Sequence, residues 1–333
     1  MKIAIIGGGA WGATLAQVVI DNNHEALIYD VNEGLVQKIN QEHRHPFFDV
    51  LLPKNLKATH NLSEVIAFQD IILLSVPTKF MRSVLKEINP LLKKPTIFID
   101  ASKGLEPETY KRMSDLVKEE INKDYLKGYV VLTGPSHAEE VILRKITLLT
   151  AASEVEEHAR LVQEIFSNET YMRVYTSTDV IGCEVGGAAK NAIAVVSGML
   201  TGAGMGENAR AALITRGILE IARIVEFYGG NKETSFGLTG IGDLIVTASS
   251  QNSRNFRAGV KLGQGKSLEE IYKEELQTIE GVRSIEALSQ LSRQEGIYLP
   301  IIQTAYEVIF NQMDKELALS SILKRQLKAE EIK

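Results

Sequence analysis

The chain has 333 residues, of which 44% are hydrophobic and 24% are charged, and its formal net charge is -5. This length exceeds the usual domain size of roughly 100 to 200 residues, so we expect two domains. The composition is that of an ordinary globular protein and excludes extensive disorder. The negative net charge gives no global electrostatic reason to bind nucleic acid.

Cys183 is the only cysteine. A single cysteine excludes an intrachain disulfide and a zinc site built from several cysteines, and it fits a reducing compartment. No leader-like segment precedes the strand-like run at 2–6, so we expect a cytoplasmic protein. The apolar stretch Ala192 to Gly206 is too short for a membrane span. We therefore predict a buried helix there and no integral membrane segment.

The first half of the chain alternates short runs rich in Ile and Val with helical spacings of apolar residues, which is typical of a parallel sheet covered by helices. The predicted strands are 2–6, 25–30, 70–75, 96–100, 129–132, 146–151 and 170–175, and the predicted helices include 80–92, 110–121 and 209–228. After about residue 178 only helical patterns remain. We predict an α/β protein: an N-terminal Rossmann-like, doubly wound, mostly parallel sheet over 1–178, then an all-α substrate-binding domain over 179–333.

A glycine-rich turn, Gly7 to Gly12, directly follows the first predicted strand and matches the spacing G-x-G-x-x-G. In such a turn Gly7 permits the tight bend, Gly9 lets the backbone approach a pyrophosphate, and Gly12 allows close packing of helix on strand. Backbone N–H groups at the helix start then bind the phosphates. The alternative is a flexible turn without a ligand. The strand and helix on either side favour a dinucleotide site.

Asp30 closes the second predicted strand. An acidic side chain at this position accepts hydrogen bonds from the adenosine ribose hydroxyls and repels the 2'-phosphate of NADP. The alternative is an aspartate that only forms the turn after the strand. No arginine follows in Val31-Asn32-Glu33 to bind that phosphate, so NAD is the predicted cofactor, with NADP as the alternative.

Lys190 and Asn191 interrupt an apolar helical run and follow the small residues at 186–189. A lysine in such surroundings is partly desolvated, which favours its neutral form and suits it to proton transfer. The alternative is a lysine that extends to the surface beside an asparagine at a helix end. The residues alone leave both readings open.

A second polar cluster comprises Gly240 to Leu244 and the triplet Ser253-Arg254-Asn255. An arginine with serine and asparagine neighbours can bind a phosphate through several directed hydrogen bonds. The alternative is a solvated loop with an exposed arginine.

Together with further motifs, these residues make the sequence resemble the NAD(P)-dependent glycerol-3-phosphate dehydrogenases of the bacterial type. The resemblance lies in motifs spread over nearly the whole chain: Gly7 to Gly12, Ser75 to Thr78, Ser102 to Gly104, Gly134 to Glu140, Lys190-Asn191, Gly240 to Leu244, Ser253 to Asn255 and Glu280-Gly281. It implies reversible reduction of dihydroxyacetone phosphate to sn-glycerol 3-phosphate, which supplies phospholipid synthesis.

The resemblance also implies residue roles. Lys190 is the expected proton donor and acceptor. The expected substrate-binding residues are Lys103, Gly134, Ser136, Lys190, Asn191, Asp243, Ser253, Arg254 and Asn255. The expected cofactor-binding residues are Gly7, Gly9, Ala10, Trp11, Gly12, Asp30, Lys103, Ala138, Arg254 and Glu280. Two positions depart from the family: Ala10 replaces a common serine, and Asp30 stands where many relatives carry basic residues, which disfavours NADP.

Rival interpretations are a related hydroxyacid dehydrogenase with the same two-domain plan and a dinucleotide-binding sensor without turnover. No metal site is predicted, because His43 and His45 lack nearby ligand residues and read as solvated loop histidines. Ser136 does not satisfy the G-x-S-x-G pattern of hydrolases. Cys183 reads as a packed thiol. A homodimer is the default oligomeric expectation.

Overall fold

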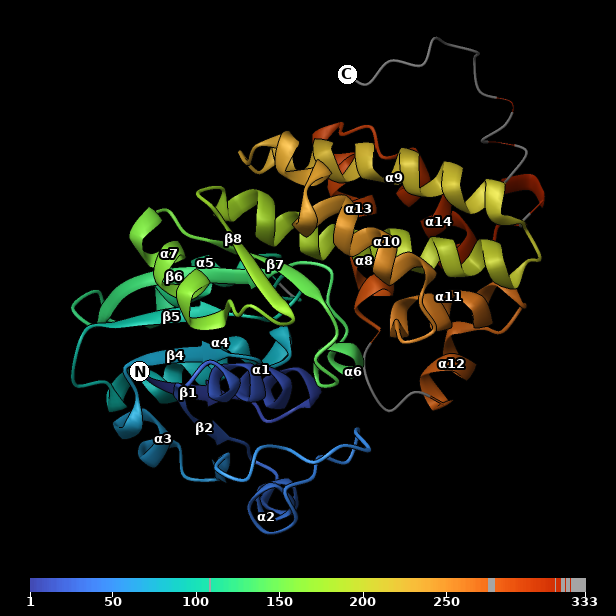
Figure 1. The fold of residues 1–333 in the computed structure, drawn as a ribbon. Helices are drawn as coiled ribbons and strands as arrows, with labels where there is room; N and C mark the ends of the chain where they lie inside the picture. The colour runs from blue at the N-terminus through green and yellow to red at the C-terminus, as the bar shows by residue number, and fades with distance from the viewer. Residues whose placement is uncertain (108, 275–278, 315, 319–320, 322–323, 325–333) are drawn as a thin grey trace. The chain divides into compact units, whose positions relative to one another are not determined.

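The structure, a computed structural model, describes residues 1–107, 109–274, 279–314, 316–318, 321 and 324 (Figure 1). The chain divides into two compact units, Met1–Glu184 and Val185–Lys333. The boundary predicted at 178 falls just before this division, between a strand that ends at Ser177 and a helix that begins at Val180. The predicted end of the helical domain at 333 lies outside the described residues.

The first unit is built on one eight-stranded sheet with the order β3-β2-β1-β4-β5-β6-β7-β8. Its strands are β1 (Lys2–Ile6), β2 (Glu25–Tyr29), β3 (Lys57–Thr59), β4 (Ile71–Leu74), β5 (Thr96–Asp100), β6 (Leu126–Thr133), β7 (Thr147–Ala152) and β8 (Met172–Ser177). Every neighbouring pair is parallel except β6 and β7, which are antiparallel. The predicted doubly wound, mostly parallel sheet is therefore confirmed.

Helices cover both faces of this sheet, because alternate side chains of each strand point to opposite faces. In β1, Ile3 and Ile5 belong to one core cluster, whereas Ala4 and Ile6 belong to another. The first cluster includes residues of α1 (Ala10–Asp21), α2 (Glu33–Glu42), α6 (Ala138–Val141) and α7 (Glu156–Phe166). The second includes residues of α3 (Leu62–Phe68), α4 (Thr78–Ile88) and α5 (Met113–Glu120). A short 3-10 turn, η1 (Asn89–Leu91), follows α4.

The second unit is helical, as predicted, and no strand occurs in its described residues. Helix α8 (Val180–Gly202) begins at the end of the first unit and continues into the second. The remaining elements are α9 (Glu207–Phe227), η2 (Lys232–Phe236), η3 (Leu238–Gly242), α10 (Asp243–Ser249), α11 (Arg254–Gly263), α12 (Leu268–Glu274), α13 (Glu280–Glu295) and α14 (Pro300–Phe310).

Helices α8 and α11 pack backbone against backbone. A Cβ on Gly198 would lie 2.1 Å from the Phe256 carbonyl oxygen, and one on Gly259 would lie 2.0 Å from the Val195 carbonyl oxygen. Contacts of this length leave no room for any side chain, so glycine is required on both helices. This packing fixes α11 against the helix that carries Lys190.

Helix α8 is longer than the predicted stretch from Ala192 to Gly206. Its mean hydropathy of 1.3 and its 23 residues would suffice to cross a membrane, but 89% of the apolar window is buried inside the protein. Such burial is what the core helix of a globular protein shows, so length and composition are weak evidence for a span. Cys183 on this helix is 1% exposed and lies in the second core cluster, which fits the predicted packed thiol.

Candidate active site

The glycine turn at the carboxyl end of β1 requires glycine for two separate reasons. Gly7 has a φ of 103°, a conformation that side chains disfavour, and a Cβ there would lie 2.5 Å from the Ser75 carbonyl oxygen. A Cβ on Gly12 would lie 2.0 Å from the Gly7 carbonyl oxygen. The chain therefore passes from β1 into α1 in the tight bend that the spacing predicts.

Gly9 is the residue of the turn that remains accessible. It is exposed, it is the N-cap of α1, and apart from Gly9 itself and its two chain neighbours no described heavy atom lies within 4 Å of the position that its Cβ would take. The first N–H groups of a helix lack acceptors within the helix, and the helix dipole favours negative charge there. An open backbone position at this helix start fits the pyrophosphate of a dinucleotide.

Asp30, after β2, holds the turn from one side. Its Oδ2 accepts a hydrogen bond of 2.8 Å from the Gly8 N–H, and its Oδ1 accepts one of 2.8 Å from the Asn32 N–H. The turn-forming role that the sequence left as an alternative is thus present. Each carboxylate oxygen has further acceptor capacity, so these bonds still leave lone pairs for ribose hydroxyls.

Three of the predicted substrate residues meet at the carboxyl ends of β5 and β6, which are adjacent parallel strands. The Lys103 ammonium donates a hydrogen bond of 3.2 Å to the Gly134 carbonyl oxygen. The Ser136 hydroxyl donates one of 3.1 Å to the same oxygen. Ala138 follows as the first residue of α6 and is half-buried. Ligands of doubly wound sheets bind at this carboxyl edge.

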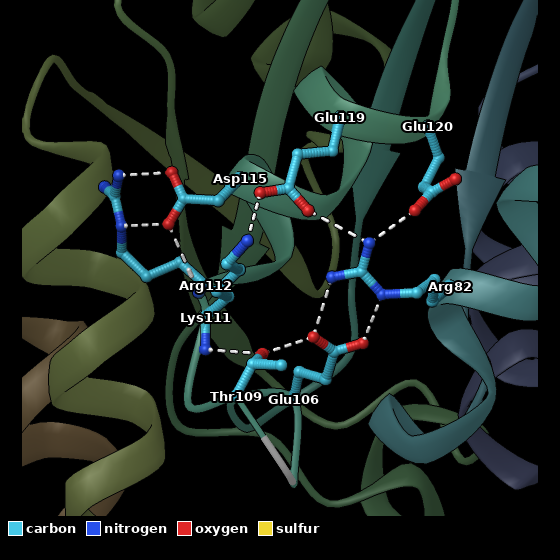
Figure 2. Close-up of polar contacts among 8 residues, drawn as sticks. All are labelled: Arg82, Glu106, Thr109, Lys111, Arg112, Asp115, Glu119 and Glu120. Carbon is cyan, nitrogen blue, oxygen red and sulfur yellow. Dashed lines mark hydrogen bonds and ion pairs between the residues drawn. The ribbon is translucent and has the colours of Figure 1, made fainter.

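The segment that continues from Lys103 is fastened to α4 and α5 by an ion-pair network (Figure 2). Arg82 on α4 binds both carboxylate oxygens of Glu106, at 2.7 and 2.8 Å, and also contacts Glu119 and Glu120 on α5. Gly104 lies against Thr78, whose Cγ2 is 3.2 Å from the position of a Cβ there. Thr78 and Arg82 are one helical turn apart, so one face of α4 supports the segment next to Lys103.

Lys190 lies inside the second unit and is 2% exposed. Its ammonium forms an ion pair with Asp243 of α10, which is 0% exposed, and donates a hydrogen bond of 2.9 Å to the Thr247 hydroxyl. The alternative of a lysine extending to the surface is therefore wrong. Burial by itself would favour the neutral amine, whereas the adjacent carboxylate favours the ammonium. The result is a buried lysine that is held by an ion pair and a hydrogen bond.

Sequence reasoning missed Thr247. Its hydroxyl contacts both Lys190 and, at 3.4 Å, the Asp243 carboxylate. The spacing of four residues between Asp243 and Thr247 on one helix could have indicated a shared face, but only after α10 was placed against Lys190.

Asn191 and Asn255 lie around the start of α13. Asn191 is 4% exposed, and a Cβ on Gly281 would lie 2.4 Å from its carbonyl oxygen. The Asn255 Oδ1 accepts a hydrogen bond of 2.9 Å from the Gly281 N–H. Glu280, the first residue of α13, is half-buried. These contacts bring three of the predicted motifs together within the helical unit.

Ser253 and Arg254 begin α11. The Ser253 hydroxyl accepts a hydrogen bond of 3.2 Å from the Phe256 N–H and so caps the helix. Arg254 is exposed at the first helical position. The triplet is thus a helix start with a cationic side chain rather than the solvated loop of the alternative reading. Cation and helix dipole both favour an anion there.

The prediction that His43 and His45 are solvated is wrong for His45. The His45 ring is 2% exposed, and its Nε2 lies 3.0 Å from the Gly8 carbonyl oxygen. His43 is half-buried, and its buried Nδ1 has no hydrogen-bond partner among the described residues. The Trp11 Nε1 is likewise buried and without a partner in the part of the chain that the structure describes. No group of residues that could hold a metal ion occurs within those described residues.

A dinucleotide turn on a doubly wound sheet, joined to a helical unit with a buried lysine and carboxylate, defines a two-domain nicotinamide-dependent dehydrogenase. Two family models match this chain. The N-terminal model of NAD-dependent glycerol-3-phosphate dehydrogenase matches residues 2–159, and the C-terminal model matches residues 179–320. The chain belongs to the NAD-dependent glycerol-3-phosphate dehydrogenase family.

Relatives support this assignment over the full length. A glycerol-3-phosphate dehydrogenase (NAD(P)+) of Acholeplasma laidlawii is 61% identical over 332 residues, which is 100% of both chains. One of Phytoplasma mali is 49% identical over 332 residues, again 100% of both chains. A crystal structure of glycerol-3-phosphate dehydrogenase from Coxiella burnetii has a TM-score of 0.89 at 30% identity and covers 97% of this chain and 99% of that one.

Proposed function

We propose that this chain interconverts dihydroxyacetone phosphate and sn-glycerol 3-phosphate by hydride transfer with a nicotinamide dinucleotide. The observation that carries the proposal is the buried Lys190, held by Asp243 and Thr247, in a chain that matches the family models over residues 2–159 and 179–320. A glycerol 3-phosphate product would supply phospholipid synthesis.

Lys190 is the proposed acid and base. When bound, the reduced nicotinamide supplies a hydride to C2 of the ketone. The Lys190 ammonium donates a proton to the oxygen at C2, so that the carbonyl becomes a hydroxyl. In the oxidising direction, the neutral amine accepts that proton. Asp243 stabilises the ammonium, and the Thr247 hydroxyl oxygen accepts a hydrogen bond from Nζ and so orients it.

Arg254 is the proposed phosphate anchor. Its guanidinium stands at the start of α11, where the helix dipole also favours an anion. Ser253 and Asn255 flank it, and their side-chain oxygens accept hydrogen bonds from the Phe256 and Gly281 backbone N–H groups. We assign the remaining contacts with substrate to Lys103, Gly134, Ser136, Asn191 and Asp243.

The proposed dinucleotide site begins at the glycine turn. Gly7, Gly9 and Gly12 form the pyrophosphate-binding bend, Ala10 and Trp11 begin the helix, and Asp30 faces the adenosine ribose. Lys103, Ala138, Arg254 and Glu280 are the further proposed cofactor contacts. We propose NAD as the preferred cofactor, because the Asp30 carboxylate would repel a 2'-phosphate.

The rival hydroxyacid dehydrogenase has a weaker basis. D-mandelate dehydrogenase with bound NADH and anilino(oxo)acetate has a TM-score of 0.61 at 15% identity, which is a likeness of fold alone.

A homodimer stays a prediction, and sedimentation equilibrium of the purified chain would test it.

The assay that tests the proposal compares substrates. We expect purified protein to oxidise NADH when dihydroxyacetone phosphate is added and to form stoichiometric glycerol 3-phosphate. A 2-oxoacid such as phenylglyoxylate should give no turnover above background. Turnover of the 2-oxoacid alone would favour the rival dehydrogenase, and NADH binding without turnover of either compound would favour a sensor.

A further inference from the structure

His45 belongs to a small closed loop that follows α2. Arg44 and Leu51 form an antiparallel bridge, and the Leu52 N–H donates a hydrogen bond of 2.8 Å to the His43 carbonyl oxygen. The loop thereby turns the His45 ring inward to the glycine turn, and the Phe48 ring packs on it with centroids 5.1 Å apart. The His45 imidazole thus connects the loop at 43–52 to the turn at 7–12.

The two partners of the ring fix its protonation state. The Gly8 carbonyl can only accept, so Nε2, at 3.0 Å, must carry a hydrogen. The Phe47 N–H can only donate, so Nδ1, at 3.3 Å from it, must be bare. His45 is therefore neutral, with its hydrogen on Nε2. Burial acts in the same direction, since it lowers the pKa of the His45 imidazole.

The bond to Gly8 has a consequence for Gly9. No cis peptide bond occurs in the described chain, and a trans peptide is planar with its C=O and N–H pointing in opposite directions. His45 holds the Gly8 C=O, while Asp30 holds the Gly8 N–H on the other side of the residue. Fixing the Gly8 carbonyl therefore aims the Gly9 N–H away from His45.

We propose that His45 is a positioning residue for the dinucleotide: its Nε2–H fixes the Gly8–Gly9 peptide plane so that the Gly9 N–H is pre-aimed at the cofactor pyrophosphate. The inference rests on the proposed dinucleotide site. It gives the histidine loop a role in cofactor affinity without direct contact. Without the bond, the peptide would rotate more freely, and binding would have to order it.

Cofactor binding, measured apart from turnover, tests this role. Trp11 is the only tryptophan and stands in the turn, so its fluorescence can be titrated with NADH. His45→Phe keeps a ring but removes the donor, and His45→Gln keeps an N–H near the Nε2 position. We expect the NADH Kd to rise about five- to tenfold in H45F, the scale of one neutral hydrogen bond, and about twofold or less in H45Q.

His24→Phe is the matched control, because His24 precedes β2 at the opposite end of that strand from Asp30. We expect its NADH Kd to equal that of the wild type. At saturating NADH, the KM for dihydroxyacetone phosphate should be unchanged in H45F. An unchanged Kd in H45F, or equal weakening in H45F and H45Q, would overturn the positioning role.

If H45F does not fold, His45→Asn replaces it, because its shorter side chain places an amide near Nδ1 and cannot reach Gly8. Weaker NADH binding by H45N than by H45Q then supports the proposal, and equal NADH affinities of the two variants overturn it. The wild-type substrate assay is independent of these titrations. A protein whose NADH affinity depends on His45 but that reduces no dihydroxyacetone phosphate would keep the inference and reject the proposed reaction.

Discussion

At the scale of the single residue, Lys190 has a proposed chemical role and an observed structural one. Lys190→Met removes the proposed proton carrier, so we expect kcat to fall by roughly 10² to 10⁴. It also leaves the Asp243 carboxylate buried without its ammonium, which should lower the free energy of unfolding by about 3 to 5 kcal/mol. The double variant K190M/D243N separates the two effects, since it should regain most of the stability and none of the turnover. A kcat for K190M within about threefold of the wild type would reject Lys190 as the proton donor.

Arg254 should distinguish phosphorylated from unphosphorylated ketones. We expect Arg254→Ala to lower kcat/KM for dihydroxyacetone phosphate by at least roughly tenfold, because hydrogen bonds to charged groups contribute about 1.5 to 3 kcal/mol. The value for dihydroxyacetone should change little. Both ketones are measured at saturating NADH. If the ratio of the two values stays constant, Arg254 does not bind the substrate phosphate.

Asp30 should set the cofactor preference. We expect a higher kcat/KM with NADH than with NADPH, because the carboxylate repels a 2'-phosphate and retains acceptor capacity for ribose hydroxyls. Steady-state kinetics with each cofactor measure this directly. An equal or greater value with NADPH would mean that Asp30 serves only the backbone of the turn, through Gly8 and Asn32.

At the scale of elements, the packing of α8 on α11 should tolerate no side chain. Gly198→Ala would place a methyl group 2.1 Å from the Phe256 carbonyl oxygen, so we expect a loss of about 1 to 3 kcal/mol in unfolding free energy. Gly186→Ala on the same helix is the matched control, since its nearest contacts are 3.9 Å away. Alanine also favours helix by about 1 kcal/mol over glycine, so G186A should be neutral or stabilising. Urea unfolding measures the free energy of unfolding of both variants. Equal changes in G198A and G186A would contradict close backbone packing of α8 on α11.

The elements also show which features a sequence can predict. Short runs rich in Ile and Val predicted seven of the strands, because this pattern is local in the sequence. Strand β3, Lys57–Thr59, has only three residues and was missed. Lys190 was found because a charge stands out in an apolar helix, and the family motifs indicated its partner Asp243. His45 and Arg82 were not found, because their partners lie 37 and 24 residues away and no local pattern marks them.

At the scale of the whole molecule, buried carboxyls make stability depend on pH. Asp100 and Glu184 are both buried, and the single Tyr129 hydroxyl contacts them at 3.1 and 2.7 Å. One hydroxyl proton cannot serve two carboxylates, so the geometry favours a protonated carboxyl. Burial raises the pKa of Asp100 from 3.8 to about 7 and raises that of Glu184 as well.

The sign of the effect follows from this raised pKa. The unfolded chain releases the Asp100 proton near pH 3.8, whereas the folded chain keeps it to about pH 7. The contribution of Asp100 to the free energy of unfolding is therefore fully present at low pH. It is lost as the pH rises from 3.8 to about 7, with a slope of up to about 1.4 kcal/mol per pH unit. Asp100→Asn stays neutral and should flatten this slope. Unfolding by urea from pH 5 to pH 8 measures it, and parallel curves for wild type and D100N would contradict a protonated Asp100.

In the whole enzyme, a hydride moves between the nicotinamide and C2 of dihydroxyacetone phosphate. The most direct test supplies NADH stereospecifically deuterated at C4, using each of the two isomers in turn, and examines the product by mass spectrometry and NMR. We expect sn-glycerol 3-phosphate with one deuterium at C2 from one isomer and none from the other. Product without deuterium from either isomer, or no glycerol 3-phosphate at all, would contradict it.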